Sequence, residues 1–165
     1  MADYVINKLT IRCKDTKQKE KIKKVIFKYD EKNKPIFTMG KLLPHPEGFS
    51  ENPTFTEIGS EWFCAAWGTK WDALYPKIFE SENIITIIYD TAWDPNGPWV
   101  LTLIRFIHQI SFSLNKQDFQ EVSVTHFYFG QYDDFGNLMT WYYIDNSYDV
   151  IKDISVSSQI PSFDF

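Results

Sequence analysis

The residues best suited to chemistry in this sequence are aromatic and lie in two short segments. Trp62, Trp67 and Trp71 surround a lone Lys70, and Trp93 follows at the end of a predicted strand. A Trp ring stacks on a base, a sugar or a cation, and its indole N–H can fix one polar group of a ligand. The alternative is that these rings close the core, with Lys70 over a ring and paired with Asp72 or Asp94. The predicted ligand-binding residues are Trp62, Trp67, Thr69, Lys70, Trp71, Trp93 and Asp94.

The sequence gives weaker evidence for catalytic or metal-binding residues than for this aromatic site. No metal site or cofactor is expected, because none of the three histidines has a second His or a Cys at a metal-ligand spacing. The sequence contains no Gly-x-Ser-x-Gly elbow and no phosphate loop. These features favour a protein without catalytic activity. A hydrolase that uses Asp90 or Asp94 beside Lys70 is kept as an alternative. The histidines are His45, His108 and His126.

The cysteines and the N-terminus indicate the compartment. Cys13 and Cys64 are too far apart for a disulfide framework or a metal motif, and both are predicted to be small buried side chains. The N-terminus lacks the basic start and apolar run of a signal peptide. No segment approaches the roughly 18 uninterrupted apolar residues of a membrane span. We therefore expect a cytoplasmic protein with no membrane partner.

Charge is distributed unevenly along the chain. The formal net charge is -5, but residues 1–41 contain 12 basic and 5 acidic residues, and residues 42–165 contain 5 basic and 17 acidic ones. The basic excess includes four lysines on one face of a predicted helix, namely Lys17, Lys21, Lys24 and Lys28. Such a face is either simply solvated or a site for nucleic-acid phosphates. The acidic remainder could instead face a basic host protein.

Hydrophobic periodicity predicts the elements that position these residues. Asp15 and Gln18 predict the N-terminal cap of the first helix, and Gly68 predicts the end of the second. Alternating strands and helices predict an α+β fold with helices packed on one face of a mainly antiparallel sheet. Residues 1–154 are expected to form one domain, and 155–165 a tail that is disordered or docked. The predicted elements are a strand at 4–12, a helix from 15 to about 29, a short apolar piece at 36–39, a helix at 58–67, a hairpin of 75–80 and 84–89, a helix at 98–112, and a hairpin of 121–129 and 137–144.

Four motifs together resemble one known family. They are Trp67-Gly68-Thr69-Lys70-Trp71-Asp72-Ala73, Thr91-Ala92-Trp93-Asp94-Pro95, Asn7-x-Leu9-Thr10-Ile11 and Leu43-Pro44-x-Pro46. The family is the YubB-type ferredoxin-like domain of plasmid-, phage- and island-encoded bacterial proteins. This chain departs from it in reading Tyr4-Val5 where the family has an aromatic-Cys pair, and the segment after Ile144 has no counterpart. The resemblance implies a ferredoxin-like sandwich, no iron–sulfur cluster and no known activity.

The resemblance also implies a biological setting. A small accessory protein of a phage or other mobile element often acts against host defence, so we expect a non-catalytic protein that binds a host factor or a small nucleotide-type ligand at the tryptophan site. The alternative is a nucleic-acid-binding domain, with the four lysines on phosphates and aromatic sheet residues on bases. Whether the chain associates with itself is left open. The aromatic sheet residues are Phe127, Phe129, Trp141 and Tyr143.

Overall fold

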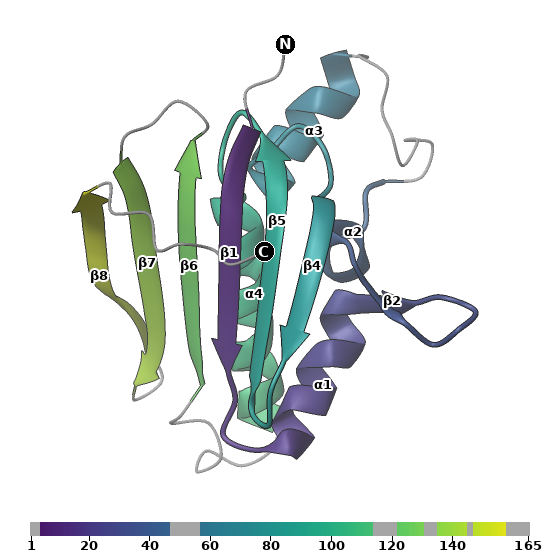
Figure 1. Ribbon diagram of the computed structural model, residues 1–165, viewed down its shortest axis with the longest axis vertical. Helices are drawn as coiled ribbons and strands as arrows, with labels where there is room; N and C mark the ends of the chain where they lie inside the picture. The colour runs from purple at the N-terminus through teal and green to yellow at the C-terminus, as the bar shows by residue number, and fades with distance from the viewer. Residues whose placement is uncertain (1–3, 47–56, 114–121, 131–134, 145–146, 158–165) are drawn as a thin grey trace.

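The computed structural model describes residues 4–46, 57–113, 122–130, 135–144 and 147–157. One antiparallel sheet carries helices on one of its faces, and a two-stranded ribbon projects at the side (Figure 1). This is the α+β class that the sequence predicts. The elements are β1 (Tyr4–Arg12), α1 (Thr16–Ile26), β2 (Phe27–Tyr29), β3 (Pro35–Phe37), α2 (Met39–Leu42), α3 (Glu57–Trp67), β4 (Leu74–Glu80), β5 (Ile84–Ala92), α4 (Gly97–Ser113), β6 (Ser123–Gly130), β7 (Phe135–Ile144) and β8 (Ser147–Ser157).

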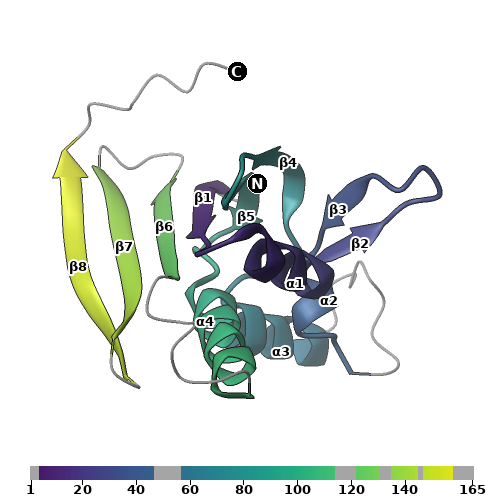
Figure 2. The same ribbon diagram turned by 90° about the horizontal axis from the view of Figure 1, so that it is seen from below.

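The sheet is built around the first strand. Within the described ranges, six strands lie in the order β4-β5-β1-β6-β7-β8, and each strand is antiparallel to its neighbours. In β1, Leu9 pairs with Ile87 of β5 on one side and with His126 of β6 on the other. Figure 2 shows α1, α3 and α4 on the same side of the strands. The chain therefore covers one sheet face with its helices.

The covered face follows from alternation along β1. Val5, Asn7, Leu9 and Ile11 are buried, whereas the residues between them are partly exposed. Successive side chains of a strand point to opposite faces, so the four buried residues face the helices. Leu9 and Ile11 belong to the main apolar core, Val5 is an apolar residue that is also buried, and Asn7 is a polar residue that is fully buried on the same face. A buried amide of this kind needs hydrogen-bond partners, which are described below.

The first helix begins at the predicted cap. The Asp15 carboxylate accepts a hydrogen bond from the Gln18 backbone N–H at 2.8 Å, and the Gln18 side chain accepts one from the Lys14 N–H at 2.8 Å. The helix ends at Ile26, so the predicted extension to about residue 29 is wrong. Phe27 leaves the helix because its ring is buried against Phe37, its partner across the β2–β3 ribbon.

Loss of this cap has a predictable cost. We expect Asp15→Ala to lower the free energy of unfolding by about 1 kcal/mol, because the Gln18 N–H loses its acceptor. Urea unfolding followed by tryptophan fluorescence measures the change. Asp15→Asn is the control, since an Asn side chain also accepts at this position and should retain most of the stability. Equal destabilisation by Ala and Asn would contradict a capping role.

Most other predicted elements are confirmed, with three corrections. The hairpins β4–β5 and β6–β7 and the long helix α4 are present. Cys13 is buried as predicted, but Cys64 is exposed. Helix α3 buries the face that carries Phe63 and Trp67, and Cys64 does not lie on that face. The piece at 36–39 is divided between β3 and α2. Strand β8 was not predicted, and it includes residues 155–157 of the expected tail; residues 158–165 lie outside the described part.

Candidate functional site

Three predicted site residues meet where β5 ends. The Lys70 ammonium lies 4.2 Å from the centroid of the Trp93 ring and 5.8 Å from that of Trp71. Lys70 is only 6% exposed, whereas Trp93 is 50% exposed. A cation at this distance over an indole ring is held by the negative charge of the ring face. We call Lys70, Trp71 and Trp93 the Trp93 platform, because the ring rests on a buried cation and still offers half of its surface to solvent.

The backbone at this end of the sheet adopts an unusual conformation. Trp93 has φ 71° and Tyr75 has φ 50°, both in the left-handed region. A residue with a side chain loses about 1–2 kcal/mol there. Tyr75 follows Leu74, which pairs with Asp90, and Trp93 follows Ala92, so both aromatics stand at the same end of the β4–β5 ladder. Both are also well exposed, so burial of the rings does not offset the cost of this backbone conformation.

Hydrogen bonds of ordinary length fix the two segments that form the platform. The Thr69 hydroxyl donates to the Ala92 carbonyl at 3.0 Å and accepts from the Ala92 N–H at 3.1 Å. The Thr91 hydroxyl donates to the Asp94 carbonyl at 2.8 Å. Thr69 and Thr91 are both buried. The segment before β4 and the turn after β5 are therefore tied together beneath Trp93.

A buried polar network supports the same turn from inside the sheet. Asn7 Nδ2 donates to the Thr91 hydroxyl at 2.9 Å and to the Val5 carbonyl at 3.0 Å. Its Oδ1 lies 2.9 Å from His126 Nε2, so the ring nitrogen is the donor of that bond. Burial lowers the pKa of His126 to about 3, and the ring is neutral. The network runs from β6 through β1 to β5 and ends at the turn that carries Trp93.

The remaining predicted residues have different surroundings. Trp62 and Trp67 pack on Phe63 within α3, with ring centroids 5.7 Å apart. Trp67 is 2% exposed and donates its indole N–H to the Leu43 carbonyl at 2.9 Å. Asp94 is exposed beside Trp93. The structure thus brings Lys70, Trp71 and Trp93 together, makes Thr69 an anchor, and places Trp62 and Trp67 in an aromatic cluster with Phe63.

The two carboxylates considered for hydrolysis, Asp90 and Asp94, have different surroundings, since Asp94 is exposed and Asp90 is partly buried. Asp90 lies on the sheet face opposite the helices, where burial raises its pKa and Lys77 partly offsets that effect. Asp72, considered as a partner of Lys70, instead accepts hydrogen bonds from the first residues of α2. Within the described residues, no group of three or more His, Cys, Asp or Glu side chains is placed to hold a metal ion.

The predicted basic face is only partly on α1. Lys17, Lys21 and Lys24 are exposed on the helix, whereas Lys28 lies in β2. Lys23 faces the sheet instead, 2.9 Å from Glu80; burial opposes its charge, but Glu80 and the neighbouring helix carboxylate outweigh that effect and raise its pKa. The ribbon and α1 lie next to each other in both views (Figure 1, Figure 2).

The helix lysines and Phe127, the one sheet aromatic of the four whose side chain is described, do not form one surface. The half-buried Phe127 pairs with Lys8 of β1, on the face opposite the helices, whereas the exposed lysines lie on the outer side of α1. None of the described helices has the length and apolar character needed to cross a membrane. The side chains of His108, Phe129, Trp141 and Tyr143 lie outside the described part of the chain.

The sequence pattern missed Asn7, Tyr75 and His126 as parts of this site. One signal was available for Asn7, since it is polar at a core-facing position between Val5 and Leu9. Nothing in the sequence indicated the left-handed backbone of Tyr75 and Trp93. Comparisons with protein-family models, with curated proteins and with solved structures find no match to this chain, so its function is inferred from the geometry of the site.

Proposed function

We propose that this protein is a non-catalytic binding protein that stacks a nucleotide-type ligand on the Trp93 platform. One observation carries the proposal: a half-exposed Trp93 ring is held in a strained backbone conformation over the buried Lys70 ammonium. Stacking of a base on an aromatic side chain contributes about 1–3 kcal/mol, and every base has a face that can stack. A platform of this kind requires no catalytic group.

The charge beneath the ring favours this ligand class. The Lys70 ammonium lies against Trp93 and close to Trp71, so both rings carry a positive charge near their faces. A positive charge behind the ring attracts an anionic phosphate and an electron-rich base on the exposed side. The buried network from His126 to Thr91 holds the turn in place before any ligand arrives. A site whose groups are positioned in advance loses less entropy on binding.

The topology and the family resemblance support a wider role for such a protein. The order β1-α1-β4-β5-α4-β6, with neighbours β4-β5-β1-β6, supports the proposal of a ferredoxin-like sandwich. In this interpretation, the segment from β2 to α3 is an insertion and β7–β8 is an extension. Together with the resemblance to the YubB-type family, this favours an accessory protein of a phage or another mobile element, located in the bacterial cytoplasm. It would sequester a nucleotide-type ligand or a host factor that carries one.

Binding to Trp93 is tested with nucleotides and a pair of variants. Adenosine and guanosine mono- and cyclic nucleotides should raise the melting temperature of the protein, because a ligand of the folded state stabilises it. Trp93→Gly and Trp93→Ala should both lose this response. Tyr29→Ala is the matched control, since Tyr29 is 43% exposed on the β2–β3 ribbon, and it should respond as the unmodified protein does.

The same variants show whether the Trp93 backbone is strained. Without ligand, Trp93→Gly should exceed Trp93→Ala in free energy of unfolding by about 1 kcal/mol, because Gly tolerates the left-handed conformation. The opposite order would show that Trp93 carries no strain. A nucleotide response that survives in folded Trp93→Gly would reject the platform as the site.

A second candidate function is nucleic-acid binding by α1. It is favoured by the exposed Lys17, Lys21 and Lys24, which follow one another along the outer side of the helix. This function predicts that a single-stranded oligonucleotide binds at low salt, that its affinity falls steeply as salt is added, and that glutamine at all three positions removes it. Binding of mononucleotides that depends on Trp93 and not on these lysines would favour the first candidate.

A further inference from the structure

The residue that follows Trp93 offers an unused hydrogen-bond acceptor beside the platform. Asp94 is exposed, and its carboxylate forms no hydrogen bond or ion pair with any residue that the structure describes. An ionised carboxylate accepts hydrogen bonds through two oxygens and has no donor of its own. Consecutive Cα atoms are roughly 3.8 Å apart, so this carboxylate is within reach of the edge of a flat ligand stacked on Trp93.

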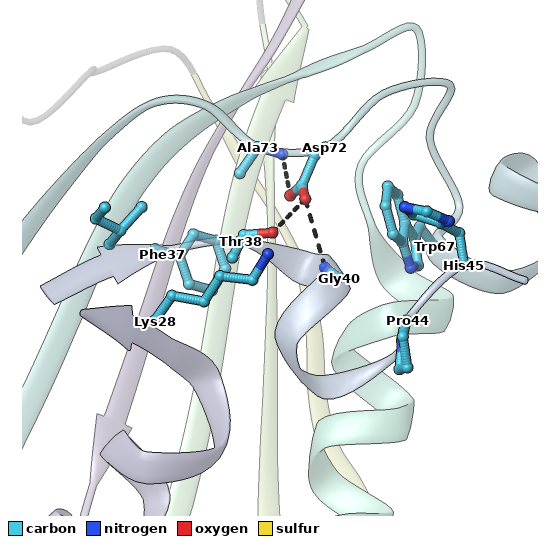
Figure 3. Close-up of a pocket in the computed structure, with 10 residues that line it drawn as sticks. Lys28, Phe37, Thr38, Gly40, Pro44, His45, Trp67, Asp72 and Ala73 are labelled. Atoms are coloured by element: carbon cyan, nitrogen blue, oxygen red, sulfur yellow. Dashed lines mark hydrogen bonds between the residues drawn. The ribbon is translucent and has the colours of Figure 1, made fainter. Parts of the chain in front are cut away.

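The other aspartate expected beside Lys70 has no such capacity. Asp72 lines a separate pocket of about 460 Å³ where the ribbon meets α2, and its carboxylate points at the first turn of that helix (Figure 3). Each of its oxygens already has two donors, which are the Thr38 hydroxyl and the N–H groups of Met39, Gly40 and Ala73. Asp72 therefore supports the fold, whereas both oxygens of Asp94 are available to a ligand.

The backbone holds Asp94 in position before a ligand binds. Its N–H donates to the Ala92 carbonyl at 2.9 Å, and its carbonyl accepts from the buried Thr91 hydroxyl at 2.8 Å. Pro95 follows, and a residue before proline is restricted to extended backbone conformations. Only the side-chain torsions of Asp94 remain to be fixed on binding, so the loss of entropy is small.

The buried ammonium behind the ring decides which donors suit this acceptor. Lys70 lies 4.2 Å from the centroid of the Trp93 ring. It is attracted to the negative charge of one ring face, and its positive charge opposes a second cation on the exposed face. A cationic ligand is therefore disfavoured, although Asp94 carries a negative charge. The ligand that fits is a neutral, flat ring whose edge presents N–H donors to Asp94.

Guanine is the base with this edge. Its N1–H and its 2-amino group lie side by side, so one carboxylate can accept hydrogen bonds from both. Adenine and cytosine each present one amino group next to a ring nitrogen that is itself an acceptor, and a carboxylate repels that lone pair. In a purine nucleotide the sugar is attached at the far side of the base from this edge, which keeps the phosphate away from Asp94.

We infer that the Trp93 platform selects guanine: the base stacks on the exposed face of Trp93, and the Asp94 carboxylate accepts hydrogen bonds from its N1–H and 2-amino groups. This inference rests on the proposed function, because it requires that a nucleotide stacks on Trp93, and it adds the base that the site selects. Asp94 is then a residue that determines specificity, a different role from the hydrolytic one considered for it from the sequence.

Three purine nucleotides with different base edges test the preference. In titration calorimetry, GMP should bind about tenfold more tightly than AMP, the size expected for one bidentate contact at an exposed site. IMP lacks the 2-amino group, and its affinity should fall between those of GMP and AMP. The phosphate is the same in all three, so the ratio of their affinities reports on the base alone. Equal affinity of GMP and AMP for the unmodified protein would overturn the inference.

A pair of charge-matched variants assigns the preference to Asp94. Asp94→Asn replaces one acceptor oxygen by a donor, so the difference in affinity between GMP and AMP should nearly disappear. Glu82→Gln is the control, because Glu82 is exposed in the turn between β4 and β5, at the opposite end of β5 from Trp93. This variant loses the same charge and should keep the full difference. An unchanged difference in Asp94→Asn would overturn the inference.

The outcomes separate this inference from the proposed function. If GMP and AMP bind equally and both require Trp93, the platform binds nucleotides without selecting the base, and only the inference fails. If neither nucleotide binds at millimolar concentration, the inference and the proposed function both fail. Without ligand, Asp94→Asn should melt at the same temperature as the unmodified protein, because the Asp94 carboxylate forms no bond with the described residues. A lost preference then reports on binding and not on unfolding.

Discussion

Gly68→Ala is expected to destabilise the protein by about 3 kcal/mol, a larger loss than an added methyl group would cause at Gly40 or Gly97. Gly68 has φ +77°, where a side chain costs about 1–2 kcal/mol. The new Cβ would also lie 2.4 Å from Pro98 Cδ and 3.2 Å from the Pro95 carbonyl oxygen. Forcing an atom into such packing costs a further 1–3 kcal/mol or so. Neither neighbour is the end of a flexible side chain, so relaxation requires α3 and α4 to separate.

Denaturant unfolding with Gly97→Ala as the control measures this effect. Gly97 begins α4 only one residue before Pro98, but a Cβ there would meet nothing within 4 Å. Its substitution should therefore change the free energy of unfolding by less than about 1 kcal/mol. If the two variants were equally stable, the close approach of Gly68 to Pro98 would be refuted. Gly68 also precedes Thr69 and Lys70, so its conformation helps to set the Trp93 platform.

The elements that sequence reasoning predicted correctly are those whose signals are local. The strand β1, the Asp15 cap of α1 and the glycine after α3 are each encoded within a few residues. Such signals depend on backbone sterics and on the period of apolar residues, and they act before any tertiary contact forms. The α+β class follows from their order along the chain.

The elements that were missed are fixed by distant residues. Strands β2 and β3 have three residues each, too few to show a period, and they exist because Phe27 and Phe37 are buried against the core. Helix α2 has four residues, and Asp72, 33 positions beyond Met39, caps its first amides. A short sequence window contains neither partner. The prediction that Cys64 is buried was wrong for a related reason. The sequence of an apolar helix does not show which of its residues lie at the edge of the buried face.

The candidate site was predictable in composition but not in arrangement. The group of Trp and Lys residues indicated a binding function, and Lys70 does lie over a ring. The choice among four tryptophans required the fold, because exposure alone distinguishes Trp93 from the buried Trp67.

Acidification from pH 7.5 to pH 5 should remove about 2 kcal/mol of stability through His126 alone. Burial lowers the pKa of this histidine from 6.5 to about 3 in the folded protein. Below pH 6.5 the unfolded chain takes up a proton that the folded protein excludes, so unfolding becomes easier as the pH falls. The contribution is constant above pH 6.5 and declines progressively down to about pH 3. The free energy of unfolding therefore decreases as the pH falls.

His126→Gln isolates this contribution, because a Gln amide can still donate to Asn7 Oδ1 but does not titrate. Urea unfolding of both proteins at pH 7.5 and pH 5 gives four free energies. The unmodified protein should lose about 2 kcal/mol more than the variant over this interval. Parallel behaviour of His126→Gln and the unmodified protein would show that His126 accepts its proton in the folded state.

The same titration links stability to the site. Protonation of His126 would place a charge in the network that runs through Asn7 and Thr91 to the Asp94 carbonyl. If the network positions the turn that carries Trp93, acid should weaken nucleotide binding at a pH where the protein is still folded, and His126→Gln should resist this weakening. If instead both proteins lost nucleotide binding only at the pH where they unfold, the network would have a role in stability alone. Protonation of His126 would then affect the position of Trp93 only by unfolding the whole protein.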